Sequence, residues 1–272
     1  MFLTFESPRS ISALKKLASQ LRAGNAEMAQ HEALNRAANA AGFSNYKHAQ
    51  RHLPEVMRLL TIRVRWRNDK SSGVESLSYP FPWSADAVVA MKLRAVRIAT
   101  SWASTPQSLT HSTIADFQYS ARVWATQCVR ELMFMEATGL RPNFISHMLP
   151  RRRIKFMGET GYERVAPPGE DHLSGWRCPV TKSVVLLDEP YVGSDEHKSA
   201  ERLKWLNDYG YTQGKSAWGG TYLPPDTYMI MLVKNGGSLT INDLESKIRG
   251  LPDNFGVSDT QWKGKSEIFA LA

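Results

Sequence analysis

Residues 171–197 read DHLSGWRCPVTKSVVLLDEPYVGSDEH and contain the clearest buried strand of the chain. After its first serine, the segment 183–187 is an unbroken apolar run, which is typical of a strand that is covered on both faces. Asp188 and Glu189 follow at once, and Pro190 then prevents further backbone pairing. Because carboxylates at the exit of such a strand often lie at ligand crevices, this stretch predicts a sheet with an acidic edge.

The acidic edge has two interpretations. If His172 and His197 fold back toward Asp188 and Glu189, these side chains offer nitrogen and oxygen donors for a divalent cation, or an acid and base pair. A metal-dependent phosphodiester hydrolase with His172, Asp188 and Glu189 as catalytic residues is then one hypothesis. The alternative is structural, with Asp188 and Glu189 as turn residues and the histidines paired with them.

Charge is distributed unevenly along the 272 residues, whose net charge is +8. Residues 1–157 carry 22 Lys or Arg against 10 Asp or Glu, so +12, whereas residues 158–272 carry 12 against 16, so −4. Such a split favours binding to nucleic acid through the basic half, since neutralised phosphates release counterions whatever the base sequence. The alternative is that the basic helices are simply well solvated.

Cysteine content and hydropathy bear on the cellular setting. The two cysteines, Cys128 and Cys178, form no CxxC pair, so neither a disulfide framework nor a cysteine-rich zinc site is expected. No apolar run approaches the roughly 20 residues that span a bilayer, and the first residues lack a secretory pattern. We therefore expect a cytoplasmic protein with no membrane partner.

Three helices are predicted before residue 57. Leucines at helical spacing define Ile11–Ala23, small residues at 33–41 define a second helix, and residues 44–53 define a third that Pro54 ends. The segment that connects the second and third helices resembles the turn of a helix-turn-helix. Its inward-facing apolar residues, however, fall at positions different from those of that motif. A DNA-recognition helix and a simple three-helix packing module both remain open, and Lys47 and Arg51 lie on the exposed edge in either case.

Several of these segments carry a resemblance to a known family. The blocks LKKLASQLRAG, HEALNRAANAAGFSNYKHAQRHL, TIRVRW, FMEATGLRP, DHLSGW and LLDEPYVGSDEHK are similar to a bacterial family of plasmid and integrative-element proteins. That family has no established activity, and its N-terminal helical module carries the label "glyoxalase-related". The resemblance implies a mobile-element or phage-defence setting and no catalytic residues. The label itself gains no support, because the glyoxalase fold needs strand-rich modules, whereas the N-terminal part of this chain is predicted to be helical.

At the start of residues 58–150, the spacing of the apolar residues changes from that of a helix to that of a strand. Arg63, Arg65 and Arg67 alternate with apolar residues, which predicts a strand with one cationic face. These arginines could contact successive phosphates of a bound strand. Alternatively, their charges could only prevent an edge strand from pairing with another chain. A turn and a returning strand complete a hairpin, and two long helices are then expected, capped by Ser84 and Ser112.

Residues 151–272 form the third predicted part. It begins with four cations that we expect to lie on a loop: Arg151, Arg152, Arg153 and Lys155. This loop could bind phosphate groups, or it could be only a solvated linker. Buried strands and short helices follow, so this part should be a mixed α/β sheet region. The whole chain is thus expected to be α+β, with a helical module (1–57), a hairpin plus two long helices (58–150) and a C-terminal domain (151–272).

The favoured function is nucleic-acid binding, with DNA or RNA as the partner. The predicted contact set consists of nine cations: Lys47, Arg51, Arg63, Arg65, Arg67, Arg151, Arg152, Arg153 and Lys155. The hydrolase is one alternative. The other is a protein-interaction scaffold or inhibitor, whose acidic second half would dock on a basic protein partner.

Overall fold

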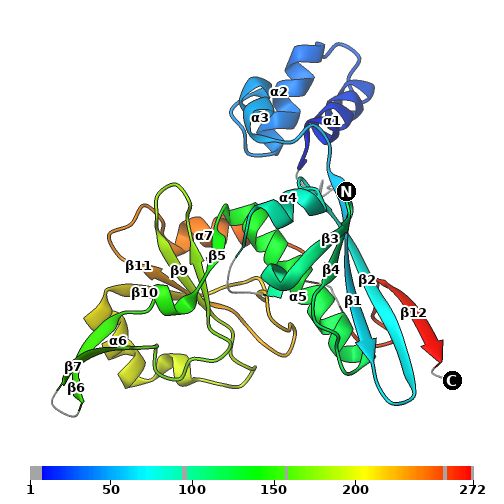
Figure 1. Ribbon diagram of the computed structural model, residues 1–272. Coiled ribbons are helices and arrows are strands. Elements are labelled where there is room, and N and C mark those ends of the chain that lie inside the picture. Colours follow the sequence, from blue (N-terminus) through cyan, green and yellow to red (C-terminus); the bar gives the residue numbers. More distant parts are fainter. Residues whose placement is uncertain (1–7, 94–96, 157–158, 254–255, 271–272) are drawn as a thin grey trace. The chain divides into compact units, whose positions relative to one another are not determined.

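The computed structural model describes residues 8–93, 97–156, 159–253 and 256–270 (Figure 1). The chain divides into two compact units, and each is described by itself. The helical unit comprises Met1–Leu60 and Pro80–Ser84, and the second unit comprises Thr61–Tyr79 and Ala85–Ala272. Helices and sheets both contribute to the fold, so the predicted α+β class is confirmed.

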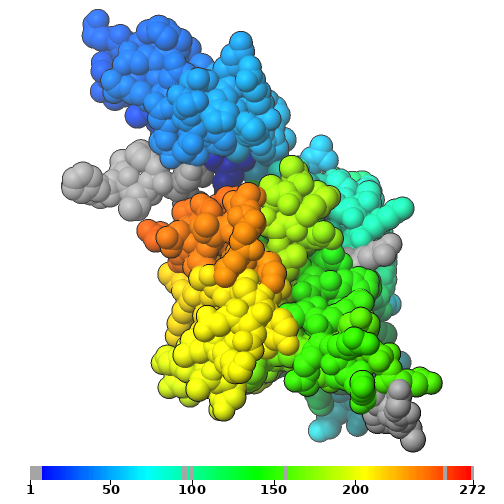
Figure 2. All heavy atoms as spheres, turned by 90° about the vertical axis from the view of Figure 1, so that its left-hand side faces the viewer, coloured from blue at the N-terminus to red at the C-terminus, as the bar shows by residue number. Residues whose placement is uncertain are grey.

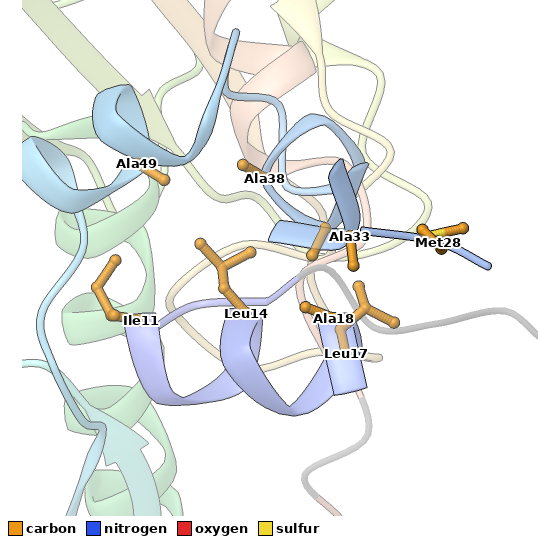
Figure 3. Close-up of a cluster of buried hydrophobic side chains, with 9 residues drawn as sticks. Ile11, Leu14, Leu17, Ala18, Met28, Ala33, Ala38 and Ala49 are labelled. Carbon is orange, nitrogen blue, oxygen red and sulfur yellow. The ribbon is translucent and has the colours of Figure 1, made fainter. Parts of the chain in front are cut away.

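The helical unit contains α1 (Ile11–Ala23), α2 (Gln30–Ala40) and α3 (Tyr46–His52). The hydroxyl of Ser10 accepts a hydrogen bond from the backbone N–H of Ala13 and so caps α1. Leucines of α1 pack on alanines of α2 and α3, whose small side chains permit a close approach of the helices (Figure 3). The buried cluster consists of Ile11, Leu14, Leu17, Ala18, Met28, Ala33, Ala37, Ala38 and Ala49.

Sheet A has the strand order β12-β2-β1-β4-β3. Its strands are β1 (Arg58–Arg67), β2 (Ser71–Phe81), β3 (Ser101–Thr105), β4 (Ser108–His111) and β12 (Lys265–Ala270). β1 pairs with β4 in parallel, whereas β3 and β12 form antiparallel edges. Along β1 the side chains of Ile62, Val64 and Trp66 are buried, which confirms the predicted two-residue alternation.

The long helix α5 (Gln118–Thr138) covers the buried face of sheet A and also reaches the second sheet. On one side, Arg122 of α5 forms an ion pair of 3.1 Å with the buried Glu75 of β2. On the other side, the ring centroid of Phe134 lies 4.8 Å from that of Trp176. The helix ends at Gly139, whose φ of 74° is left-handed. Because α5 contacts both sheets, its second half is buried on every side.

Sheet B has the strand order β10-β11-β9-β8-β5, and every described pairing in it is antiparallel. Its strands are β5 (Arg141–Asn143), β8 (Ser174–Arg177), β9 (Val184–Asp188), β10 (Tyr211–Lys215) and β11 (Ile230–Lys234). β9 is the buried strand that the sequence predicts. Trp205 and Leu206 of α6 (Ala200–Tyr209) pack on Leu186, Ile230 and Leu232 of this sheet. α7 (Ile241–Ile248) also belongs to the second unit, and Figure 2 shows the atoms of α6 in yellow and of α7 in orange.

The remaining elements are short. α4 (Ala85–Ala90) precedes the 3-10 helix η1 (Arg97–Thr100), and two further 3-10 helices are η2 (Ile145–His147) and η3 (Glu196–Lys198). A separate two-stranded ribbon consists of β6 (Arg151–Phe156) and β7 (Glu159–Arg164).

Three predictions of local structure need correction. The helix expected from Ser84 ends at Ala90, and β3 and β4 occupy residues 101–111. The second long helix begins at Gln118 and not near Ser112, and Ile114 and Phe117, which precede it, are exposed. The cations at 151–155 lie on a strand and not on a loop. Each error has the same cause, because these short segments take their conformation from pairing with distant strands.

The predicted domain limits also differ from the observed units. The limit at residue 57 lies close to Leu60, where the first stretch of the helical unit ends. The limit at residue 150 does not coincide with a division of the structure, since β5 pairs with β8 across it. Residues 58–150 and 151–272 therefore share a sheet.

Candidate nucleic-acid interface

The outer face of sheet A, opposite α5, carries the arginines of β1. Arg65 and Arg67 are exposed and Arg63 is half-buried, because their neighbours along the strand point to the core. Among the residues that the structure describes, no carboxylate lies within ion-pair distance of these three guanidinium groups. The three positive charges are therefore available to an external anion.

An aromatic side chain lies beside these arginines. Trp102 of β3 pairs with Thr110 of β4, and Thr110 in turn pairs with Arg63 of β1, so Trp102 lies on the same outer face. The guanidinium carbon of Arg65 lies 5.4 Å from the centroid of the Trp102 ring, and 39% of Trp102 is exposed. This cation–π pair holds a flat aromatic surface within the cationic row. The sequence interpretation missed Trp102, because its strand was not predicted.

Hydroxyl groups lie on both sides of the arginine row, toward β2 and toward β3. The hydroxyls of Thr61 and Ser78 lie 2.7 Å apart, and that of Ser104 lies 2.9 Å from the hydroxyl of Thr110. Such small polar side chains keep the face flat and can donate hydrogen bonds to phosphate oxygens. The outer face of sheet A thus combines cations, hydroxyls and one exposed indole.

The edge strand β12 extends this face. Ser266 points to the buried side, where its hydroxyl donates to Glu75, so its neighbours Lys265 and Glu267 point outward. Phe269 shares their side of the strand and is 54% exposed. The edge therefore adds one cation, one carboxylate and a second exposed aromatic ring.

The other predicted contacts lie on two separate surfaces. Arg151, Arg152, Arg153 and Lys155 are all exposed on β6. Lys47 and Arg51 are exposed one turn apart on α3, which has only seven residues and belongs to the helical unit. On β6, Arg153 pairs across the ribbon with the exposed Tyr162, whereas on sheet A the arginines of β1 lie beside the indole of Trp102.

The predicted catalytic residues do come together, with Asp188 and Glu189 buried and His172 partly exposed. Asp188 Oδ1 accepts a hydrogen bond of 2.7 Å from the backbone N–H of Asp171, and His172 Nδ1 lies 3.1 Å from the carbonyl oxygen of Glu189. Asp188 Oδ2 lies 2.6 Å from Nη1 of Arg202, and neither side chain is exposed. Burial raises the pKa of Asp188, and the charge of Arg202 opposes that shift.

The carboxylate of Glu189 is likewise occupied by internal donors. It accepts hydrogen bonds from the backbone N–H and the hydroxyl of Thr221, the latter at 2.7 Å, and from the N–H of Tyr222 at 3.0 Å. The ring of His172 stacks on Tyr222 with centroids 3.7 Å apart. In the described ranges, no group of three or more His, Cys, Asp or Glu side chains is arranged to hold a metal ion. The two carboxylates are thus bound by internal donors, and His172 contacts the backbone of Glu189 and the carboxylate of Asp171.

A second ionic network, which was not predicted, lies along α5. Glu131 pairs with Arg97 at 3.0 Å, and burial raises the pKa of Glu131. Arg130 pairs with Asp253 at 2.8 Å, and its guanidinium carbon lies 4.4 Å from the ring centroid of Trp218. Burial lowers the pKa of Arg130. These charges tie α5 to sequence-distant segments; Arg130 and Glu131 are buried, whereas their partners Asp253 and Arg97 are partly exposed.

Comparisons of the chain with protein-family models, with curated proteins and with solved structures give no significant match. No helix in the described part of the chain has the length and apolar character needed to cross a membrane.

Proposed function

We propose that this protein binds nucleic acid and that an unpaired stretch of DNA or RNA lies across the outer face of sheet A. The observation that carries the proposal is a set of three arginines beside the exposed ring of Trp102, which have no carboxylate partner within the described part of the chain. Residues two apart on a strand repeat at about 6.6 Å, so the guanidinium groups can contact successive phosphates. Trp102 supplies a surface on which a base can stack, as proteins that bind single strands commonly do.

The remaining predicted cations, Lys47 and Arg51 on α3 and the basic residues of β6, lie on surfaces of their own and are not among the contacts proposed for the strand that crosses sheet A. A mobile-element or phage-defence setting stays a proposal that rests only on the family resemblance. We do not propose hydrolysis, because the carboxylates of Asp188 and Glu189 are buried and occupied by internal donors. No observed surface favours a particular protein partner for the acidic half.

Replacing Arg63, Arg65 and Arg67 together by glutamine is expected to weaken binding to a single strand about 100-fold near 0.1 M salt. The reason is that each phosphate contact on a single strand contributes about 0.7 to the dependence of log affinity on log salt concentration. Fluorescence anisotropy with a labelled 20-nucleotide strand measures the effect. Trp102→Ala should cost at least about fivefold, since stacking on an aromatic side chain contributes roughly 1–3 kcal/mol per base.

The control removes three cations that already have carboxylate partners. Lys15, Arg36 and Lys204 pair at the surface with Glu55, Glu32 and Asp208. Their joint replacement by glutamine changes the net charge by the same amount and should alter the affinity by less than about threefold. Equal losses in both triple variants would mean that only net charge matters, and the assignment to sheet A would fail.

A further inference from the structure

The β6–β7 ribbon separates its charges onto two faces. Antiparallel pairing places Arg151 opposite Arg164, Arg153 opposite Tyr162 and Lys155 opposite Thr160. Alternation along each strand puts these six side chains on one face, which we call the basic face. Within the described residues of β6 and β7, four cations and no carboxylate belong to it.

The opposite face carries the acids. Arg152 lies across from Glu163, and its Nε donates to that carboxylate at 2.6 Å. Glu159 shares this face, because it pairs with Phe156. Arg152 is therefore neutralised locally, whereas among the described residues no carboxylate lies within ion-pair distance of Arg151, Arg153 or Lys155. The run of four cations thus divides into three unpaired ones and one paired one.

The ribbon has a fixed base. The backbone N–H of Val165 donates to the carbonyl oxygen of Pro150, which closes the two strands at their open end. The indole N–H of Trp205 on α6 then donates to the carbonyl oxygen of Val165 at 3.2 Å. Figure 1 shows the ribbon extending past α6 within the second unit. Tyr162 on the basic face is 69% exposed, so this face is open to a partner.

We infer that the basic face of the ribbon binds a nucleic-acid duplex in its major groove. This inference rests on the proposed function and adds a paired ligand to it. Two strands lie about 4.8 Å apart, and a two-stranded ribbon fits a major groove of about 12 Å. Arg151, Arg153 and Lys155 repeat at about 6.6 Å along the strand, so each can contact a different phosphate at the edge of the groove.

The test compares the two faces of the same strand in the full-length protein. Anisotropy titrations use a labelled 20-base-pair DNA duplex and one of its strands alone, between 50 and 300 mM salt. The variants are Arg153→Gln on the basic face, Arg152→Gln on the opposite face, and the triple variant with glutamine at 151, 153 and 155. All of these side chains are exposed, so the variants should keep the thermal midpoint of the parent protein.

The triple variant should lose about 500-fold in duplex affinity near 0.1 M salt. The slope of log affinity against log salt should become shallower by about 2.7, at about 0.9 for each lost phosphate contact. Affinity for the single strand should change by less than about twofold, and Arg152→Gln should behave like the parent protein, because that guanidinium is already paired.

Four results would overturn the inference. They are an unchanged duplex slope in the triple variant, an equal loss in Arg152→Gln and Arg153→Gln, an equal loss for single strand and duplex, and a parent protein that binds single strands but no duplex. The last result would leave the proposed function intact. A parent protein that binds neither ligand would remove both proposals.

Discussion

Replacing Asp188 by alanine is expected to lower the free energy of unfolding by about 3 to 5 kcal/mol, because the change leaves the charge of Arg202 buried without a counter-ion. Both side chains are fully buried and lie 2.6 Å apart. Arg202 would keep only neutral acceptors, the carbonyl oxygen of Pro168 at 3.3 Å and the side-chain oxygen of Gln213 at 3.1 Å. The backbone N–H of Asp171 would also lose its acceptor.

Urea unfolding of the parent protein and of the Asp188→Ala variant measures this difference. Asp195→Ala is the matched control, since Asp195 forms an exposed ion pair with Lys198 and should cost less than about 1 kcal/mol. Adding Arg202→Met to Asp188→Ala should recover part of the loss, because it removes the uncompensated charge. A variant at Asp188 as stable as the parent would contradict a structural role and return this carboxylate to the set of candidate functional groups.

Replacing Glu189 by alanine should cost about 3 to 4 kcal/mol through a different mechanism. Its carboxylate accepts hydrogen bonds from two backbone N–H groups and one hydroxyl, all contributed by Thr221 and Tyr222. A buried donor that loses its acceptor costs about 1 to 3 kcal/mol, and three donors would be affected together. The segment at 221–222 would then lose its attachment to the end of β9.

Glu189→Gln separates geometry from charge. The amide oxygen can accept from both backbone N–H groups, and the amide nitrogen can donate to the hydroxyl of Thr221. We therefore expect Glu189→Gln to lose less than half as much stability as Glu189→Ala in the same urea experiment. If the two variants were equally destabilised, the negative charge and not the hydrogen-bond pattern would hold the segment.

The parts of the fold that were predictable from sequence are those governed by local rules. Ile11–Ala23 is helical between the predicted limits, because its leucine spacing, the Ser10 cap and Gly24 all agree. The alternation along β1 predicted both its buried side and its arginine side, since the side-chain period of a strand is fixed. The buried strand β9 was predictable from its continuous apolar run.

The features that were not predictable depend on distant partners. Ser101–Thr105 is a strand only because it pairs with β4, so the position of Trp102 beside Arg65 could not be inferred from its neighbours in sequence. The same holds for β6, where only the pairing with β7 shows which cation meets Glu163. The acidic pair at 188–189 looks like a site in sequence, but Arg202 and Thr221, which occupy the two carboxylates, are far away in the chain.

The most direct measurement of the central claim is the salt dependence of binding to a labelled 20-nucleotide single strand. Three phosphate contacts from Arg63, Arg65 and Arg67 predict that log affinity falls against log salt concentration with a slope of about −2 or steeper. The triple glutamine variant at these positions should be shallower by about 2. A parent protein whose affinity is independent of salt, or that does not bind the strand at low salt, would contradict the account.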